Sequence, residues 1–380
     1  MPGRPIPQCM PLDLHEALAR VIETQGSDLH LKVPAFPLIR THGHLQPIPD
    51  TEPLQPEDTE RMLKQMLSDP SKLEEWEQSG EVDFSYAVEG VARFRVNAFR
   101  QRGHCSIVCR AIPFEIKSAE QLMLPDAITQ LAEEERGIIL VTGTTGSGKS
   151  TTLAAMIDQM NRNHSKHIVT IEDPVEFLHR DKKSIINQRE VGMDTAGFKQ
   201  ALKRVLRQDP DVILVGEMRD EETVQTALSA AETGHLVLST LHTVDATETI
   251  NRIIDFFPPH HQQQARAMIA GTLKGVISQR LVRTTDGHGR VAVCEILRTT
   301  GRVKDMIMNP EETGRLGEVI AEGAFYGMQT FDQHLMEHVN AGRVSMEEAL
   351  KAATAPHDFK LLVAAGGQRS TSVEQVTHAA

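Results

Sequence analysis

The sequence predicts an α/β protein in two parts, a smaller α+β half and a larger half built on a mostly parallel sheet. Two observations support this prediction. A complete phosphate-binding loop of the form G-x-x-x-x-G-K-[ST] occupies residues 143–150, between an apolar strand-like segment and a helical one. From residue 124 onward, apolar runs alternate with amphipathic segments, which is typical of a parallel sheet covered by helices on both faces.

Composition narrows the class of protein. The chain has 380 residues, of which 40% are hydrophobic and only 4% aromatic, so we expect two domains with mainly aliphatic cores. A net charge of -12 and a pI near 5.8 argue against a dedicated nucleic-acid binder. The four cysteines form no C-x-x-C pair, which favours free thiols in a reducing compartment. Without a signal peptide or a long apolar run, we expect a cytoplasmic protein with no direct membrane insertion.

Changes in composition suggest the domain boundaries. The proline-rich residues 1–11 are expected to be a disordered leader, and the small, polar residues 366–380 a disordered tail. Between them we expect an N-terminal domain at 12–114, a hinge or linker at 115–124, and the nucleotide-binding domain at 125–365.

The N-terminal half contains short amphipathic segments. Helical spacing of apolar residues is found at 14–22 and 59–67, and strand-like alternation at 29–33 and 82–86. A longer alternating stretch, 92–110, places Arg93 and Arg95 on the face opposite its apolar side chains. These two arginines are either part of a solvated polar surface or a phosphate contact, and the pattern alone leaves both open.

The larger half reads as strands separated by helices. We expect strands at 137–142, 167–171, 211–216, 236–241 and 290–296. Helices are expected between them at 150–161, 196–208, 221–233 and 246–256. Beyond residue 260 the pattern predicts only helices, apart from that last strand, at 260–282, 302–308, 312–322, 330–341 and 345–354.

The phosphate-binding loop predicts a nucleoside triphosphate with Mg²⁺ as ligands. Its residues are Gly143, Thr144, Thr145, Gly146, Ser147, Gly148, Lys149 and Ser150, followed by Thr151. Glycines let backbone N–H groups turn inward around phosphate, and the following helix adds a partial positive charge. Lys149 is expected to reach the β- and γ-phosphates, and the Ser150 hydroxyl to bind Mg²⁺. A chance glycine-rich turn is the alternative, and the flanking strand and helix argue against it.

Acidic residues follow two of the predicted strands. One strand ends near Glu172, Asp173 and Glu176, and another leads through Gly216 to Glu217. In a parallel nucleotide-binding sheet, the carboxyl ends of strands open onto the ligand. Carboxylates there can hold Mg²⁺ through water or accept a proton from an attacking water. An ordinary polar loop is the alternative for the first group.

Two histidines flank the strand expected at 236–241. His242 follows it, where a polar side chain is placed to sense the γ-phosphate, and His235 precedes it. Because a lone histidine is more often structural, both roles stay open for each residue.

Together these segments resemble the secretion-ATPase superfamily, the hexameric motors of type II and type IV secretion and of type IV pili. The run L-R-Q-D-P-D-V-I-L-V-G-E-M-R-D at 206–220 is close to diagnostic. Within the superfamily the chain resembles the PilT-type retraction ATPases of twitching motility over about residues 12–360. Segments 26–31, 93–99 and 327–332 support this resemblance.

The resemblance implies a fold, ligands and partners. It implies a small PAS-like N-terminal domain followed by a RecA-like ATPase domain with a helical C-terminal part. It also implies ATP and Mg²⁺ as ligands and assembly into a homohexamer. The partners it implies are an inner-membrane pilus platform protein and a paralogous pilus ATPase, with the motor docked at the cytoplasmic face of the inner membrane.

The resemblance also implies roles for individual residues. Glu176 would activate water, Glu217 would organise Mg²⁺ and its waters, and His242 would couple the γ-phosphate to domain position. Arg93 and Arg95 would supply further positive charge, with Arg110 as a weaker candidate.

Three alternatives stay open. The family's short Ala-Ile-Arg-rich helix has only a poor match, at 300–307, which leaves room for a PilU-like accessory motor. A pilus assembly or type II secretion ATPase is the second alternative, although the chain is short and lacks the four-cysteine insertion of those relatives. The third is a nucleotide-regulated binding module with little turnover.

Overall fold

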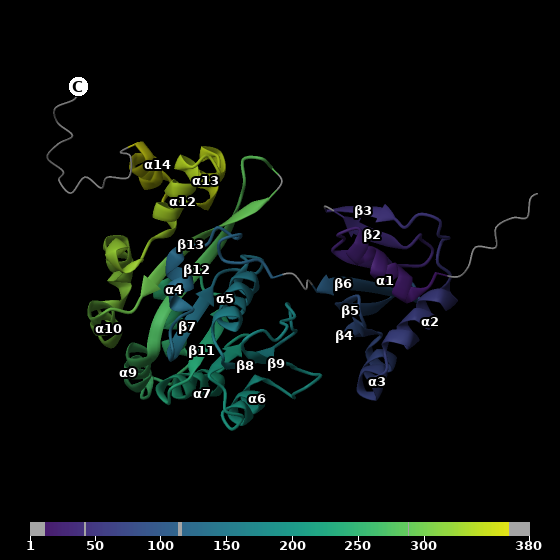
Figure 1. Cartoon of the computed structure of the whole chain (residues 1–380), viewed down its shortest axis with the longest axis horizontal. Helices are drawn as coiled ribbons and strands as arrows, with labels where there is room; N and C mark the ends of the chain where they lie inside the picture. Colours follow the sequence, from purple (N-terminus) through teal and green to yellow (C-terminus); the bar gives the residue numbers. More distant parts are fainter. Residues whose placement is uncertain (1–11, 42, 113–115, 288, 365–380) are drawn as a thin grey trace, which may run out of the picture. The chain divides into compact units, whose positions relative to one another are not determined.

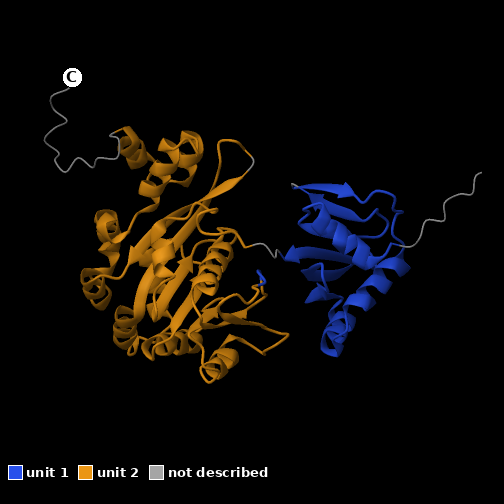
Figure 2. Cartoon of the chain, viewed as in Figure 1, with its two compact units in different colours: residues 1–115, 176–178 blue, residues 116–175, 179–380 orange. Residues whose placement is uncertain are grey.

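The computed structural model describes residues 12–41, 43–112, 116–287 and 289–364 (Figure 1). The predicted leader and tail therefore lie outside the described residues. The chain divides into two compact units (Figure 2). Unit 1 comprises Met1–Glu115 with Glu176–Leu178, and unit 2 comprises Ile116–Val175 with His179–Ala380.

Unit 1 is an α+β domain built on an antiparallel sheet of six strands, in the order β3-β2-β1-β6-β5-β4. The strands are β1 (Asp28–Leu31), β2 (Leu38–Thr41), β3 (His44–Pro47), β4 (Glu81–Val88), β5 (Ala92–Gln101) and β6 (His104–Ile112). The helices are α1 (Leu14–Glu23), α2 (Pro56–Met66) and α3 (Pro70–Ser79). Apolar side chains of α1, α2 and one sheet face form the core of the unit.

The alternating stretch expected at 92–110 is a hairpin of two strands, not one strand. Arg102 and Gly103 both have positive φ, 52° and 83°, as a tight two-residue turn between twisted strands requires. The predicted facing is confirmed in β5, where Phe94, Val96 and Ala98 are fully buried.

Unit 2 contains a seven-stranded sheet in the order β13-β12-β7-β11-β10-β8-β9. Its strands are β7 (Gly137–Thr142), β8 (His167–Glu172), β9 (Ile185–Glu190), β10 (Val212–Val215), β11 (Leu236–Leu241), β12 (Leu273–Arg283) and β13 (Arg290–Arg298). All neighbours pair in parallel except β12 and β13, which are antiparallel. The central strands are buried on both faces, which explains why they read as continuous apolar runs.

Helices cover both faces of this sheet. The helices of unit 2 are α4 (Asp126–Leu131), α5 (Lys149–Asn163), α6 (Phe198–Val205), α7 (Glu221–Glu232), α8 (Ala246–Asp255), α9 (Gln262–Thr272), α10 (Gly301–Met308), α11 (Leu316–Glu322), α12 (Phe331–Asn340), α13 (Met346–Ala352) and α14 (Pro356–Ala364), with short 3-10 turns at Thr313–Arg315 and Ala324–Tyr326. Helices α4 and α5 pack on one face, and α6 to α11 pack on the other. None of the described helices is both long and apolar enough to cross a membrane.

The helix expected over 260–282 is wrong in its second half. Helix α9 ends at Thr272, and the chain continues as β12 between β7 and β13. The segment contains β-branched residues Val276, Ile277 and Val282, and pairing with two neighbouring strands buries them. Those pairing partners lie far away in sequence, so local spacing could not indicate the strand.

Two further features differ from the expected pattern. Strand β9, which was not predicted, pairs in parallel with β8 at the edge of the sheet. Ala119 and Leu124, within the segment predicted as a linker, are buried in the core shared by α4 and α5. The described part of that segment, from residue 116, therefore packs as part of unit 2.

Candidate nucleotide site

The phosphate-binding loop connects the buried strand β7 to α5, as predicted. Gly143, Gly146 and Gly148 have φ of 140°, 78° and 93°, values that L side chains rarely adopt. Helix α5 begins at Lys149, so its unpaired N–H groups face the loop. Thr144 and Thr145 are exposed at the tip, whereas Ser150 and Thr151 are half-buried at the start of the helix.

Two side chains of the loop are prepared for a polar ligand. The buried Lys149 ammonium donates hydrogen bonds to the carbonyl oxygens of Gly143, at 2.8 Å, and Thr144, at 3.1 Å. The Ser147 hydroxyl is also buried, and it has no hydrogen-bond partner among the described residues. A buried polar group without a partner costs free energy, and a phosphate oxygen bound in the loop would accept its proton.

Strand β12 supports the loop from the side. The buried Gln279 Oε1 accepts a hydrogen bond from Thr152 Oγ1 at 2.8 Å, and Thr142 Oγ1 donates to Ser278 Oγ at 2.9 Å. A Cβ atom on Gly148 would lie 2.7 Å from Gln279 Nε2, so the two segments are in close contact. Sequence reasoning missed Gln279, because it had assigned this segment to a helix.

Glu217 lies beyond the end of β10 in a positively charged setting. Its carboxylate is 2.6 Å from Arg219 Nη2 and 3.4 Å from His242 Nε2. Burial raises the pKa of Glu217, but the hydrogen bond and charge of Arg219, with the charges of His242 and Lys149, outweigh it and hold the pKa below its ordinary value. The structure thus brings Lys149 and His242 close to the Glu217 carboxylate, which is held in its ionised form.

The two histidines that flank β11 lie at opposite ends of this strand. Leu241, the last residue of β11, pairs with Thr142, the last residue of β7. His242 therefore lies at the carboxyl ends of the strands, where the phosphate loop begins. Leu236 pairs with Gly137, so His235 lies at the other end, where its Nδ1 is 3.0 Å from the Ala230 carbonyl oxygen. This position gives His235 a structural contact with the end of α7, and only His242 lies with the site residues.

The acids after β8 do not form one cluster. Glu172 Oε1 accepts hydrogen bonds from Thr170 Oγ1 at 2.6 Å and Gln188 Nε2 at 3.3 Å. Asp173 is exposed, and its charge raises the pKa of Arg219, although less than Glu217 does. Glu176 is exposed and belongs to the short segment 176–178 that is grouped with unit 1. Its action on water therefore stays a prediction.

The arginines of unit 1 lie on the polar face of its sheet. Arg95 pairs with Ser85 on one side and with Arg110 on the other. Arg110 Nε donates to the buried Asp28 at 2.8 Å, whereas Arg95 is exposed and has no hydrogen bond or ion pair among the described residues. Arg93 is half-buried on the same strand. Their action on nucleotide also stays a prediction.

The oxygen atoms at the loop suit Mg²⁺. The Ser150 hydroxyl and the ionised Glu217 carboxylate are hard ligands of the kind this ion prefers. Among the described residues, no three histidine, cysteine, aspartate or glutamate side chains gather as a metal site would require. This donor set fits an ion held largely by phosphate and water, which is usual for Mg²⁺ at nucleotide sites.

Comparison with known proteins identifies the class. The family model "Type II/IV secretion system protein" matches residues 13–376, so the chain belongs to this family.

Individual relatives cover almost the whole chain. The type IV pilus retraction ATPase PilT of Pseudomonas aeruginosa is 44% identical over 348 residues, 92% of this chain and 100% of PilT. The type IV pilus ATPase PilU of the same organism is 39% identical over 357 residues, 94% of this chain and 93% of PilU. A crystal structure of the pilus retraction motor PilT with bound ADP has a TM-score of 0.84 at 44% identity, covering 92% of this chain and 99% of that chain. These similarities confirm the predictions of a PilT-like pilus retraction ATPase, of ATP hydrolysis and of the α/β fold.

Proposed function

We propose that the chain binds ATP with Mg²⁺ on residues 143–151 and hydrolyses it as a homohexamer to retract a type IV pilus. The observation that carries the proposal is the convergence of Lys149, Glu217 and His242 at the carboxyl ends of the strands. The nearby loop hydroxyl of Ser147 has no hydrogen-bond partner among the described residues. The ADP bound in the similar PilT structure supports nucleotide binding by this chain.

Each residue of the cluster contributes through its charge. Lys149 would exchange its carbonyl partners for phosphate oxygens and offset their negative charge. The Ser147 hydroxyl would donate a hydrogen bond to the same phosphate. Glu217 stays ionised and orients water near the γ-phosphate, held by Arg219 and His242. When bound, Mg²⁺ would neutralise charge on the β- and γ-phosphates. His242 Nε2 lies 3.4 Å from Glu217 and directly follows β11, so it can transmit loss of the γ-phosphate to that strand.

Assembly supplies what this cluster lacks. Phosphoryl transfer usually needs an additional arginine, and Arg93 and Arg95 lie on the open face of a domain without a phosphate loop. We assign them, with Glu176, to the closed state of the hexamer. The work is delivered to an inner-membrane pilus platform protein, with a second pilus ATPase as a further partner, at the cytoplasmic face of the inner membrane.

The loop assignment is tested by Lys149→Ala, with Glu217→Gln beside it. Lys149→Ala is expected to lose several kcal/mol of transition-state stabilisation and thus nearly all turnover. Glu217→Gln should keep ATP affinity and lose about a hundredfold in rate. Lys166→Ala, an intermediate-exposure lysine before β8, is the matched control. Phosphate release and nucleotide binding are measured on folded, purified protein, and near-normal turnover of Lys149→Ala would contradict the site.

The role of unit 1 is tested by the double variant Arg93→Ala, Arg95→Ala. It is expected to assemble normally and to lose at least about a hundredfold in turnover, the scale for a missing arginine at a phosphoryl-transfer site. The control double variant, Arg20→Ala with Arg61→Ala, removes two arginines from helices of the same unit. Light scattering and phosphate release on the same samples decide the matter, and unchanged activity of the first variant would remove these arginines from the mechanism.

The similarity to PilU favours one second candidate, an accessory motor that acts only beside another retraction ATPase. Cells that lack their own retraction ATPases separate the two functions. Twitching restored by this chain alone identifies the principal motor. Twitching restored only when a second retraction ATPase is also present identifies the accessory one.

A further inference from the structure

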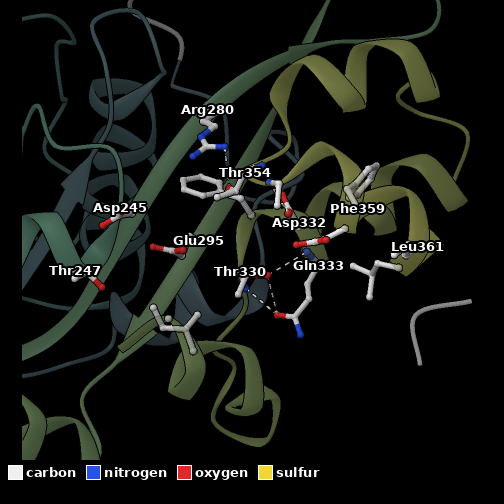
Figure 3. A pocket seen from close by; sticks show the side chains of 16 residues that line it. Asp245, Thr247, Arg280, Glu295, Thr330, Asp332, Gln333, Thr354, Phe359 and Leu361 are labelled. Carbon is white, nitrogen blue, oxygen red and sulfur yellow. Dashed lines mark hydrogen bonds between the residues drawn. The ribbon is translucent and has the colours of Figure 1, made fainter. Parts of the chain in front are cut away.

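Unit 2 contains a cavity of about 640 Å³ that none of the nucleotide-site residues lines (Figure 3). Its walls come from β12, β13, α11, α12, α14 and the start of α8, together with the turn before that helix. The volume is in the range of sites that take small organic ligands or a few side chains. Nothing in the proposed ATPase mechanism uses it.

The charged side chains of the wall are mostly carboxylates. They are Asp245, Glu295, Asp332 and Asp358, facing a single cation, Arg280. The Arg280 guanidinium is already engaged: it stacks 3.8 Å above the Phe331 ring centroid and donates to the Ala352 carbonyl and Thr354 hydroxyl oxygens. Asp332 accepts from the N–H groups of Thr354 and Ala355, and Asp245 accepts from that of Glu248. The wall still holds more carboxylates than cations, and Glu295 and Asp358 are the least engaged of them.

Glu295 is the most deeply placed of these carboxylates. Only 9% of the residue is exposed, and its Oε1 accepts a hydrogen bond from the Ala246 N–H at 2.9 Å. Its other oxygen makes no hydrogen bond among the described residues, although the side chain lines the cavity (Figure 3). A nine-tenths buried carboxylate with one unused oxygen is a position where a donor or a cation would be stabilised.

The surroundings of Glu295 raise its pKa to about 7. Burial has the largest effect and raises the pKa, and the charges of Asp245 and Asp332 raise it further. The hydrogen bond from the Ala246 N–H and the charge of Arg280 lower the pKa, but by less. A cation beside the free oxygen would favour the ionised form. Binding near neutral pH should therefore release a proton.

The arrangement fits an extended cation better than a metal ion. Among the described residues, no three carboxylate or imidazole side chains gather as a metal site would require. Between the carboxylates the wall is apolar, with Ile320, Phe331, Phe359, Leu361 and Leu362. We propose that this cavity binds an organic cation, an ammonium or guanidinium group on an apolar stem, with Glu295 as its counter-ion.

Calorimetric titration of the full-length chain tests the proposal. Agmatine and n-hexylamine are the cationic probes, and hexanoate has a similar stem with the opposite charge. We expect saturable binding of the cations only, with proton release seen as a dependence of the heat on buffer ionisation enthalpy at pH 7. Glu295→Gln keeps an acceptor for Ala246 and should weaken binding about tenfold or more, the effect of one charge-assisted contact.

Two further variants complete the test. Glu337→Gln changes an exposed carboxylate of α12 outside the cavity wall and should bind like the unmodified protein. Asp358→Asn changes an exposed wall residue that makes no hydrogen bond among the described residues, so it tests the charge even if Glu295→Gln fails to fold. Binding of hexanoate as strong as that of the amines, no binding of either amine, or unchanged affinity in the folded wall variants would overturn the proposal.

The peptide acetyl-Leu-Arg-Leu-amide distinguishes two sources of the cation. Binding at least about tenfold tighter than agmatine assigns the cation to an arginine side chain of a partner protein. Tighter binding of agmatine than of the peptide assigns it to a free amine. Both results support the site, and binding of the peptide that survives replacement of its arginine by norleucine contradicts it.

Discussion

Replacing Gly143 with alanine is expected to destabilise unit 2 and to disable the phosphate loop. A Cβ atom at this position would lie 2.4 Å from the Gln279 backbone oxygen and 2.6 Å from Ser147 Oγ. The φ of 140° is itself a conformation that alanine rarely adopts. Overpacking against backbone costs about 1–3 kcal/mol, and strained φ about 1–3 kcal/mol more, so we expect a loss of about 2–6 kcal/mol.

Gly146→Ala is the matched control in the same loop. Gly146 has a φ of 78°, but a Cβ atom there meets nothing within 4 Å. Only the conformational penalty remains, about 1–2 kcal/mol. For a domain of this size 1 kcal/mol shifts the unfolding midpoint by about 2–4 °C, so we expect a fall of roughly 10 °C for Gly143→Ala and a few degrees for the control.

Differential scanning calorimetry without nucleotide measures both shifts. A separate scan of the unmodified protein with ADP identifies the transition of unit 2, because ligand binding should raise its midpoint. Because the Gly143 carbonyl holds Lys149, any loop shift that relieves the clash should also cost turnover. Equal midpoint shifts for the two variants, or full activity of Gly143→Ala, would refute the packing of the loop against β12 described above.

Three further predictions each concern a single residue. Thr152→Val removes the hydroxyl that donates to Gln279 and leaves a buried acceptor unpaired, so denaturant unfolding should show a loss of about 1–3 kcal/mol that Thr152→Ser largely avoids; equal losses would contradict this. Burial, with the charges of His338 and Arg343, lowers the pKa of His334 to about 3, so the folded state keeps it neutral while the unfolded chain binds a proton below its ordinary value of 6.5. Stability should be complete above that pH and fall by about 1.4 kcal/mol per unit below it, a slope that His334→Gln should reduce in unfolding curves from pH 7 to 5. Glu176→Gln should bind ATP normally and turn it over about a hundredfold more slowly, and normal phosphate release would assign this residue to structure.

The phosphate loop and the residues facing it could be predicted because their chemistry fixes residue types at fixed spacing. Lys149 needs the glycines before it and the helix after it, and all of these are local in sequence. Glu217 and His242 could be placed beside it because parallel strands open their carboxyl ends at one edge. The proximity of the three side chains in the structure follows from that rule and from the order of the motifs.

Other parts of the site depend on long-range contacts that a local pattern cannot contain. Gln279 bonds to a residue 127 positions away, and its strand exists because β7 and β13 pair with it. Arg219 is one of many exposed arginines in the sequence, and only the structure shows its contact with Glu217. The sequence favours a functional role for His242 over His235 without excluding either, and their positions at opposite ends of one strand separate them.

Two neighbouring residues of β12 hold different parts of unit 2 in place. Gln279 supports the phosphate loop through Thr152, while Arg280, which points to the opposite face, holds the backbone between α13 and α14. Deleting the last helices would leave the half-buried Arg280 guanidinium without these hydrogen-bond partners, directly beside Gln279, which supports the loop. The C-terminal helices therefore help to hold the strand against which the phosphate loop packs.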